Sequence, residues 1–173
     1  SAASDVYKRQ LKGLKEQADF LVDTTDLNVH QLRARLLEIF EAEASDSAMK
    51  ITVLSFGYKH GLPRDADLVF DCRFLPNPHW VPELRSLTGL DQPVRDYVLS
   101  SPDAVALLDK LTDLLLSTFP AFEREGKSYL TIAIGCTGGQ HRSVVLGSEL
   151  ASRLERAGYC NQVNHRDIGR ANR

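Results

Sequence analysis

The segment from Tyr129 to Ser143 constrains the fold of this chain more than any other. Its first half, residues 129–134, is an apolar run typical of a β-strand, and a short glycine-rich loop follows and leads into a segment with helical periodicity. Proteins build phosphate cradles from this succession, because glycines let backbone amides approach an anion and a helix N-terminus adds partial positive charge. The sequence therefore predicts an anion cradle over residues 136–143.

Several side chains of this segment are candidates for ligand contact. The predicted phosphate-binding residues are Cys136, Thr137, Gly138, Gly139, Gln140, His141, Arg142 and Ser143. Arg142 is the best suited, because a guanidinium group can donate two parallel hydrogen bonds to phosphate oxygens. His141 is predicted to contact a phosphate or hydroxyl group, and capping of the following helix is the alternative.

The same loop matches Cys-x5-Arg-Ser, the active-site pattern of cysteine-dependent phosphatases, through Cys136 and Arg142. In that chemistry a thiolate attacks phosphorus and a general acid protonates the leaving group. Gly135 stands where those phosphatases usually carry histidine, and the candidate acids Asp71 and Asp91 lie in no recognisable acid loop. A binding cradle is therefore favoured, with a phosphatase and a purely structural turn as alternatives.

The rest of the chain alternates strands and helices. Strands are predicted at residues 51–56, 68–72, 128–134 and 160–165, and helices at residues 103–125 and 140–157. This alternation predicts an α/β fold, a small and mostly parallel sheet with flanking helices. Ligands of such sheets bind beyond the carboxyl ends of the strands, which is where the glycine-rich loop lies.

A second group of candidates follows the strand at residues 68–72. Asp71 and Arg73, at alternate positions, are expected on one face, where they can hold a polyol or amino sugar or pair with each other. His79 lies in a segment with three prolines that is predicted to be non-helical, and either contacts the ligand or belongs to a surface loop. Trp80 and Phe74 are predicted as core residues rather than a ligand platform.

The charge balance limits nucleic-acid binding. The chain of 173 residues has a net charge of −2, so RNA contact would need a local basic patch. Lys59 and His60 can add positive charge above the pocket, although a solvated turn is favoured. The C-terminal end supplies a modest patch, with a frayed charged tail as the alternative. The RNA-binding candidates are His165, Arg166, Arg170 and Arg173.

The cysteines and the hydropathy pattern indicate a compartment. The three cysteines are widely spaced and form no CxxC pair, which argues against disulfides and against a structural zinc site, so no metal is predicted. The sequence contains no apolar run of about 18 residues that would predict a membrane span, and no visible signal peptide. A cytoplasmic protein is therefore expected.

Five motifs in combination resemble the RapZ/YvcJ family of bacterial nucleotide-binding proteins. They are Leu54–Gly61, Asp67–Asp71, Arg73–Trp80, Leu87–Asp91 and Ile134–Ser143. The resemblance extends over residues 11–173. It implies an N-terminal kinase-like domain with a Walker A loop and a C-terminal domain that binds a phosphosugar. This chain contains no GxxxxGK[ST] sequence, so ATP or GTP binding and weak nucleotide hydrolysis are expected only when that loop is present.

Residues 1–10 show no pattern that fits the rest of the chain and are interpreted as a non-native-looking leader. The resemblance also implies a division of the remaining chain and a ligand. Residues 11–45 are interpreted as the tail of the kinase-like domain, and residues 50–173 as the C-terminal domain. The implied ligand is glucosamine-6-phosphate or a related amino-sugar phosphate, held by Asp71, Arg73, His79 and the cradle. Implied partners are further copies of the chain, small regulatory RNA and an endoribonuclease. The expected function is regulatory sensing of the phosphosugar without catalysis.

Overall fold

The computed structural model describes residues 24, 29, 32 and 49–170. The chain divides into two compact units, Ser1–Ser47 and Ala48–Arg173, and the sheet with the helices that accompany it belongs to the second. The interpretations of residues 1–10 and 11–45, and the assignment of Arg173 to RNA binding, lie outside the described residues.

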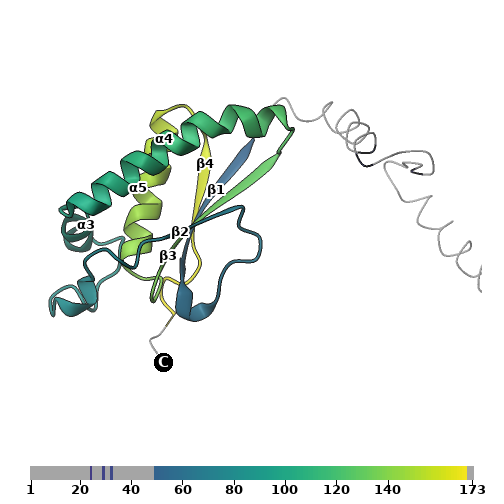
Figure 1. Ribbon diagram of the computed structural model, residues 1–173. Coiled ribbons are helices and arrows are strands. Elements are labelled where there is room, and N and C mark those ends of the chain that lie inside the picture. Colours follow the sequence, from purple (N-terminus) through teal and green to yellow (C-terminus); the bar gives the residue numbers. More distant parts are fainter. Residues whose placement is uncertain (1–23, 25–28, 30–31, 33–48, 171–173) are drawn as a thin grey trace, which may run out of the picture. The chain divides into compact units, whose positions relative to one another are not determined.

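Four parallel strands form the sheet, in the spatial order β2-β3-β1-β4 (Figure 1). They are β1 (Lys50–Gly57), β2 (Leu68–Asp71), β3 (Tyr129–Cys136) and β4 (Asn161–His165). The parallel sheet confirms the predicted α/β class. Gly57 lies opposite Cys136, and Asp71 lies opposite Gly135. Because all strands run the same way, their carboxyl ends meet at one edge of the sheet.

Three α-helices accompany the sheet within residues 49–170. They are α3 (Gln92–Leu99), α4 (Pro102–Arg124) and α5 (Arg142–Arg156). Helix α5 packs on β1, β3 and β4, and α4 packs on α5 (Figure 1). The helices predicted at residues 103–125 and 140–157 are confirmed as α4 and α5, whereas α3 was not predicted. Among the described helices, none combines the length and apolarity needed to cross a membrane.

Two short 3-10 helices follow the carboxyl ends of strands, η1 (Tyr58–His60) after β1 and η2 (Pro78–Trp80) after β2. The second corrects the prediction of a non-helical loop. Proline fixes its own φ near the helical value and lacks only an amide that the first turn leaves unused, so Pro78 can begin a helical turn. Both turns therefore project from the edge where a ligand is expected.

The core lies between the sheet and the two longer helices. Side chains on α5 at helical spacing are fully buried against the sheet, including Leu150 and Leu154, and Leu108 and Leu115 of α4 are buried behind them. Each such leucine contributes roughly 1.5–3 kcal/mol to stability through burial. Both helices therefore bury one apolar face within the domain.

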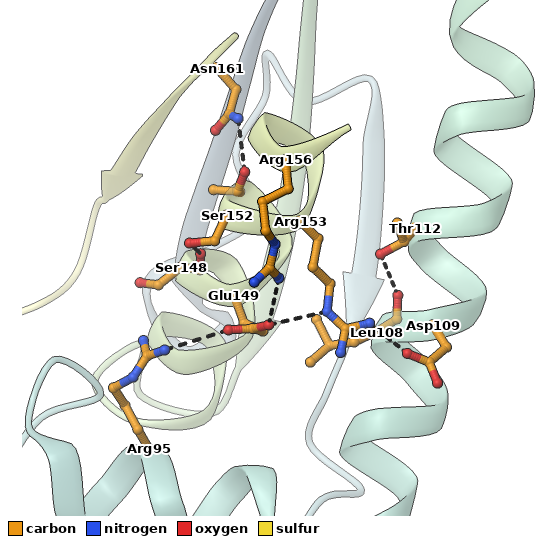
Figure 2. Close-up of polar contacts among 11 residues, drawn as sticks. Arg95, Leu108, Asp109, Thr112, Ser148, Glu149, Ser152, Arg153, Arg156 and Asn161 are labelled. Atoms are coloured by element: carbon orange, nitrogen blue, oxygen red, sulfur yellow. Dashed lines mark hydrogen bonds and ion pairs between the residues drawn. The ribbon is translucent and has the colours of Figure 1, made fainter. Parts of the chain in front are cut away.

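A charged cluster on the outer side of this core links the three helices (Figure 2). Glu149 of α5 pairs with Arg95 of α3 at 3.5 Å, and with Arg153 and Arg156 of its own helix at 3.2 and 3.4 Å. Arg153 also pairs with Asp109 of α4 at 2.6 Å. One carboxylate thus serves three guanidinium groups, and the helix layer is held by charge as well as by apolar packing.

Candidate functional site

Residues 137–141, here called the cradle loop, connect β3 to α5 and pass very close to the end of β1. Gly139 has a φ of 76°, and a Cβ atom there would lie 2.7 Å from the Gly57 nitrogen. A Cβ atom on Gly57 would lie 2.5 Å from the carbonyl carbon of Gly138. The glycines therefore allow a backbone-to-backbone contact that any side chain would prevent.

The thiol of Cys136 faces this loop from the end of β3 and is almost completely buried. Its Sγ accepts a hydrogen bond from the Gly139 amide at 3.2 Å and lies 3.1 Å from the Ser143 hydroxyl oxygen. The Gly139 amide is thereby used to hold sulfur. The loop therefore packs around the thiol itself.

The residue before this cysteine is glycine for a steric reason. A Cβ atom on Gly135 would lie 2.5 Å from ring carbons of both Phe56 and Tyr58, whose rings pack together with centroids 4.8 Å apart. A histidine, as in cysteine-dependent phosphatases, would collide with both rings. The departure from the phosphatase pattern is therefore built into the packing of this sheet.

The two candidate general acids are both held in their ionised form. Hydrogen bonds from the Arg73 side chain lower the pKa of Asp71. The backbone amide of Thr88 donates to Asp91 at 2.7 Å and, together with the Thr88 hydroxyl, lowers the pKa of that carboxyl group. A general acid must carry a proton at the working pH, so neither aspartate suits the role.

Arg142 is the first residue of α5, and its side chain is only 4% exposed. One terminal nitrogen donates to the carbonyl oxygens of Arg73 and Leu75, at 2.6 and 3.0 Å, and the other lies 3.4 Å from the Thr137 hydroxyl. These acceptors are neutral, so they orient the guanidinium without cancelling its charge. The positive end of α5 adds to that charge.

The cradle loop is fastened on its other side by residues 87–89. His141 Nε2 lies 2.7 Å from the Leu87 carbonyl oxygen, and the Gly89 amide donates to the Gln140 carbonyl oxygen at 2.8 Å. Because a carbonyl can only accept, Nε2 carries the proton. Burial lowers the pKa of His141, which favours the neutral ring.

A cavity of about 410 Å³ opens in front of the loop, within the range of small-molecule sites. Its lining residues are Lys59, Asn77, His79, Trp80, Cys136, Thr137, Gly138, Gln140, His141 and Arg142. Gly139 and Ser143 are not among them and support the loop from behind. Of the described residues, no group of three or more His, Cys, Asp or Glu side chains is placed to hold a metal ion.

Asp71 and Arg73 do not line this cavity. The Arg73 guanidinium donates to both oxygens of Asp71, at distances from 2.7 to 3.0 Å, and stacks 4.0 Å over the Tyr58 ring. The two residues pair with each other, which was one of the two sequence-based alternatives. Arg73 nevertheless contacts the site through its carbonyl oxygen, which holds Arg142.

The prediction that Trp80 and Phe74 belong to the core is wrong, since their side chains are 74% and 62% exposed. Leu75 and Pro78 of the same segment are buried in their place. Residues around η2 project beyond the sheet, where the two rings no longer face the core. Trp80 lines the cavity and Phe74 does not.

Residues 166–170, here called the C-terminal strap, cross behind the cradle loop. Asp167 is fully buried, accepts from the Gly57 amide at 2.8 Å, and pairs with Arg166 at 2.7 Å and Arg170 at 3.3 Å. Gln140 Nε2 donates to the Arg170 carbonyl oxygen at 2.5 Å. These contacts exclude a frayed tail as far as Arg170.

The side chains proposed for RNA contact are engaged within the domain. Arg166 and Arg170 both pair with Asp167, which offsets one of their two charges. His165, at the end of β4, lies 2.8 Å from the Ser55 hydroxyl through Nδ1 and 3.3 Å from the Ser148 hydroxyl through Nε2. None of these three side chains lines the cavity.

Fold and site together define a small parallel α/β domain with a glycine-rich strand–loop–helix turn at the carboxyl edge of its sheet. Residues 49–169 match the family model of the RapZ C-terminal domain. The chain therefore belongs to the RapZ C-terminal domain family, as the motifs indicated.

Relatives of similar sequence are named nucleotide-binding proteins. One from Thermobifida fusca is 54% identical over 160 residues, covering 92% of this chain and 54% of the relative. One from Salinispora arenicola is 54% identical over 165 residues, covering 95% and 56%, and one from Saccharopolyspora erythraea is 55% identical over 161 residues, covering 92% and 55%. The chain thus spans about half the length of these relatives.

Proposed function

We propose that this domain binds a phosphorylated amino sugar, such as glucosamine-6-phosphate, and acts as a regulatory sensor of that metabolite. The observation that carries the proposal is the position of Arg142. Its guanidinium is buried in the wall of a small-molecule cavity, beside the N-terminus of α5, and its hydrogen-bond acceptors are all neutral. A buried charge of this kind is stabilised by a ligand of opposite sign.

In this proposal the cradle loop and Arg142 hold the phosphate, and His79, which also lines the cavity, contacts the sugar. Asp71 and Arg73 act on the site through the Arg73 carbonyl group, which fixes the orientation of Arg142. Lys59 also lines the cavity and increases its positive potential. No carboxylate is found among the described residues that line the cavity, which favours an anionic ligand.

The proposal extends to the longer protein. Residues 11–45 would belong to a nucleotide-binding domain that takes ATP or GTP, because the relatives match 92% of the chain and carry that name. Small regulatory RNA, an endoribonuclease and further copies of the chain are the proposed partners, in the cytoplasm. The C-terminal strap would connect these partners to the ligand, since it contacts the cradle loop through Gln140.

Calorimetry with glucosamine-6-phosphate, inorganic phosphate and unphosphorylated glucosamine tests the binding. We expect the phosphorylated compounds to bind and glucosamine to bind far more weakly. Arg142→Ala should weaken phosphosugar binding by about 2 kcal/mol, roughly 30-fold in Kd, because a charge-assisted contact is lost. Arg124→Ala, at the exposed end of α4, is the control and should leave Kd unchanged.

Two results would remove the assignment of the cradle. One is equal affinity for glucosamine and its phosphate in the wild type. The other is unchanged affinity in an Arg142→Ala variant whose circular dichroism shows the native fold. Arg142→Lys keeps the charge but cannot reach two carbonyl oxygens and the ligand together, so it should bind with intermediate affinity.

A cysteine phosphatase is the second candidate, favoured by the contact between Cys136 and Ser143. The steric block at Gly135 and the ionised state of Asp71 and Asp91 weigh against it. Release of inorganic phosphate from glucosamine-6-phosphate or an aryl phosphate, abolished by Cys136→Ser, would establish this candidate. In a sensor, Cys136→Ser leaves the Kd for the phosphosugar close to that of the wild type.

A further inference from the structure

Trp80 lines the wall of the cavity with a largely exposed indole ring. The proposed function assigns no role to this side chain. Phe74, six residues earlier, is exposed to a similar degree but lies outside the cavity lining. The two rings therefore differ in one respect, which is access to the ligand. Single exposed aromatic rings are common on protein surfaces, so exposure alone does not indicate a ligand contact. The position of Trp80 in the cavity wall does.

Hydrogen bonds hold the short turn that carries the indole. The Trp80 amide donates to the Asn77 carbonyl oxygen at 3.1 Å, and the Asn77 side chain accepts from the His79 amide at 3.2 Å. Arg85 Nε donates to the His79 carbonyl oxygen at 3.0 Å. The His79 ring packs edge-on against the indole, with centroids 5.5 Å apart. The turn that carries Trp80 is thus fixed, and the His79 ring limits the orientations of the indole, which reduces the conformational freedom lost when a ligand stacks on it.

The cavity is larger than a phosphate ion needs. Arg142 and the cradle loop provide the proposed anion-binding groups, and the lining also includes Asn77, His79 and Trp80. An aromatic face packs well against the C–H groups of a sugar ring, and an acyclic chain covers such a face poorly. The part of the wall that carries Trp80 therefore suits a ring.

We propose that Trp80 is a specificity-determining residue that selects phosphates attached to a saturated ring over free phosphate and phosphates on short acyclic chains. This inference rests on the proposed function, because it takes the phosphate position from the cradle loop. It adds the class of molecule to which the phosphate is attached. In this proposal Arg142 provides the affinity for phosphate, and Trp80 provides the preference for a ring.

Trp80 is the single tryptophan of the chain, so its emission reports directly on this wall. Titrations with glucosamine-6-phosphate, glycerol-3-phosphate and inorganic phosphate should change the emission most with the sugar phosphate. By calorimetry, Trp80→Leu should weaken glucosamine-6-phosphate binding roughly tenfold and leave inorganic phosphate within about twofold. Trp80→Phe should retain most of the affinity, and Phe74→Leu is the matched control that should change neither ligand.

The outcomes separate this inference from the proposed function. If the wild type binds neither the sugar phosphate nor inorganic phosphate, the proposed function fails and the inference with it. If phosphate and sugar phosphate bind but Trp80→Leu changes their affinities equally or not at all, only the role of Trp80 is overturned. Equal wild-type affinity for the cyclic and acyclic phosphates would overturn it as well.

Discussion

Gly139 makes the strongest demand for a particular residue in the site. Its positive φ alone costs an L-residue roughly 1–2 kcal/mol, and a Cβ atom would also meet the Gly57 backbone at 2.7 Å. We expect Gly139→Ala to lower the free energy of unfolding by about 3 kcal/mol, because strain and overpacking add. Urea unfolding followed by circular dichroism measures this change.

Gly158 provides a matched control for that substitution. Its φ is 92°, at the end of α5, but a Cβ atom there would meet nothing within 4 Å. Gly158→Ala should therefore cost only about 1 kcal/mol. Equal losses in the two variants would mean that the contact between the cradle loop and β1 contributes nothing.

Among single residues, the sequence identified those of the cradle loop that line the cavity and missed those that depend on a local turn. The cradle was predictable because glycine spacing and a following helix are short-range signals. Lys59 and Asn77 were not chosen as site residues, although both follow strands whose carboxyl ends define the site. That Asp71 and Arg73 pair with each other could not be decided from spacing, because it depends on the rotamers that both side chains adopt.

Among the elements, the helix layer depends on Glu149, the carboxylate shared by three arginines (Figure 2). Glu149→Gln leaves those guanidinium groups near one another without a counter-charge. We expect a loss of about 1 kcal/mol of stability at low salt, and less at high salt because exposed charges are screened. Urea unfolding at two salt concentrations tests both expectations.

Asp109→Asn is the comparison for this network. Asp109 pairs only with Arg153 among the contacts drawn, and its side chain is 60% exposed, so the loss should stay within about 0.5 kcal/mol. A loss as large as that of Glu149→Gln, or one independent of salt, would contradict a network centred on Glu149.

The elements themselves were mostly readable from the sequence. Three of the four strands and the two long helices were predicted because each has an apolar run or face of sufficient length, and β4 was predicted although Val163 is its single apolar residue. Helix α3 was not predicted, since an eight-residue helix that begins next to Pro93 offers little more than two turns of periodicity. The short helix η2 was not predicted, because the prolines around it indicated a segment without helical structure. One of those prolines, Pro78, begins the helical turn.

In the whole described domain, three segments distant in sequence support one loop. Residues 87–89 hold the cradle loop on one side, the end of β1 touches it at Gly57, and the C-terminal strap crosses behind it. Asp167 is the buried centre of this arrangement, because its carboxylate contacts both the Gly57 amide and the strap arginines. Such long-range support cannot be recognised from the sequence. There Asp167 is only one acidic residue among the arginines of the C-terminal end.

The pH dependence of stability follows from the buried His141, the partly buried His165 and the paired aspartates of the domain. Burial lowers the pKa of both His141 and His165, so protonation favours the unfolded chain, whose histidines have a pKa of about 6.5. Stability should therefore be full above pH ~6.5 and decline as the pH falls below it towards the folded-state pKa. Asp71 and Asp167 have lowered pKa values, so their contribution is lost only below about pH 4.

Urea unfolding at several pH values should accordingly show two separate declines, one below about pH 6.5 and one below about pH 4. His165→Asn isolates the first, because burial lowers the pKa of His165 and its ring nitrogens lie within hydrogen-bond distance of the Ser55 and Ser148 hydroxyls, which carry no charge. The variant can be less stable at every pH, but its stability should fall less steeply between neutral pH and pH 5 than that of the wild type. An unchanged slope would show that His165 takes up its proton without cost in the folded domain, and stability that rises on acidification would contradict the burial of both rings.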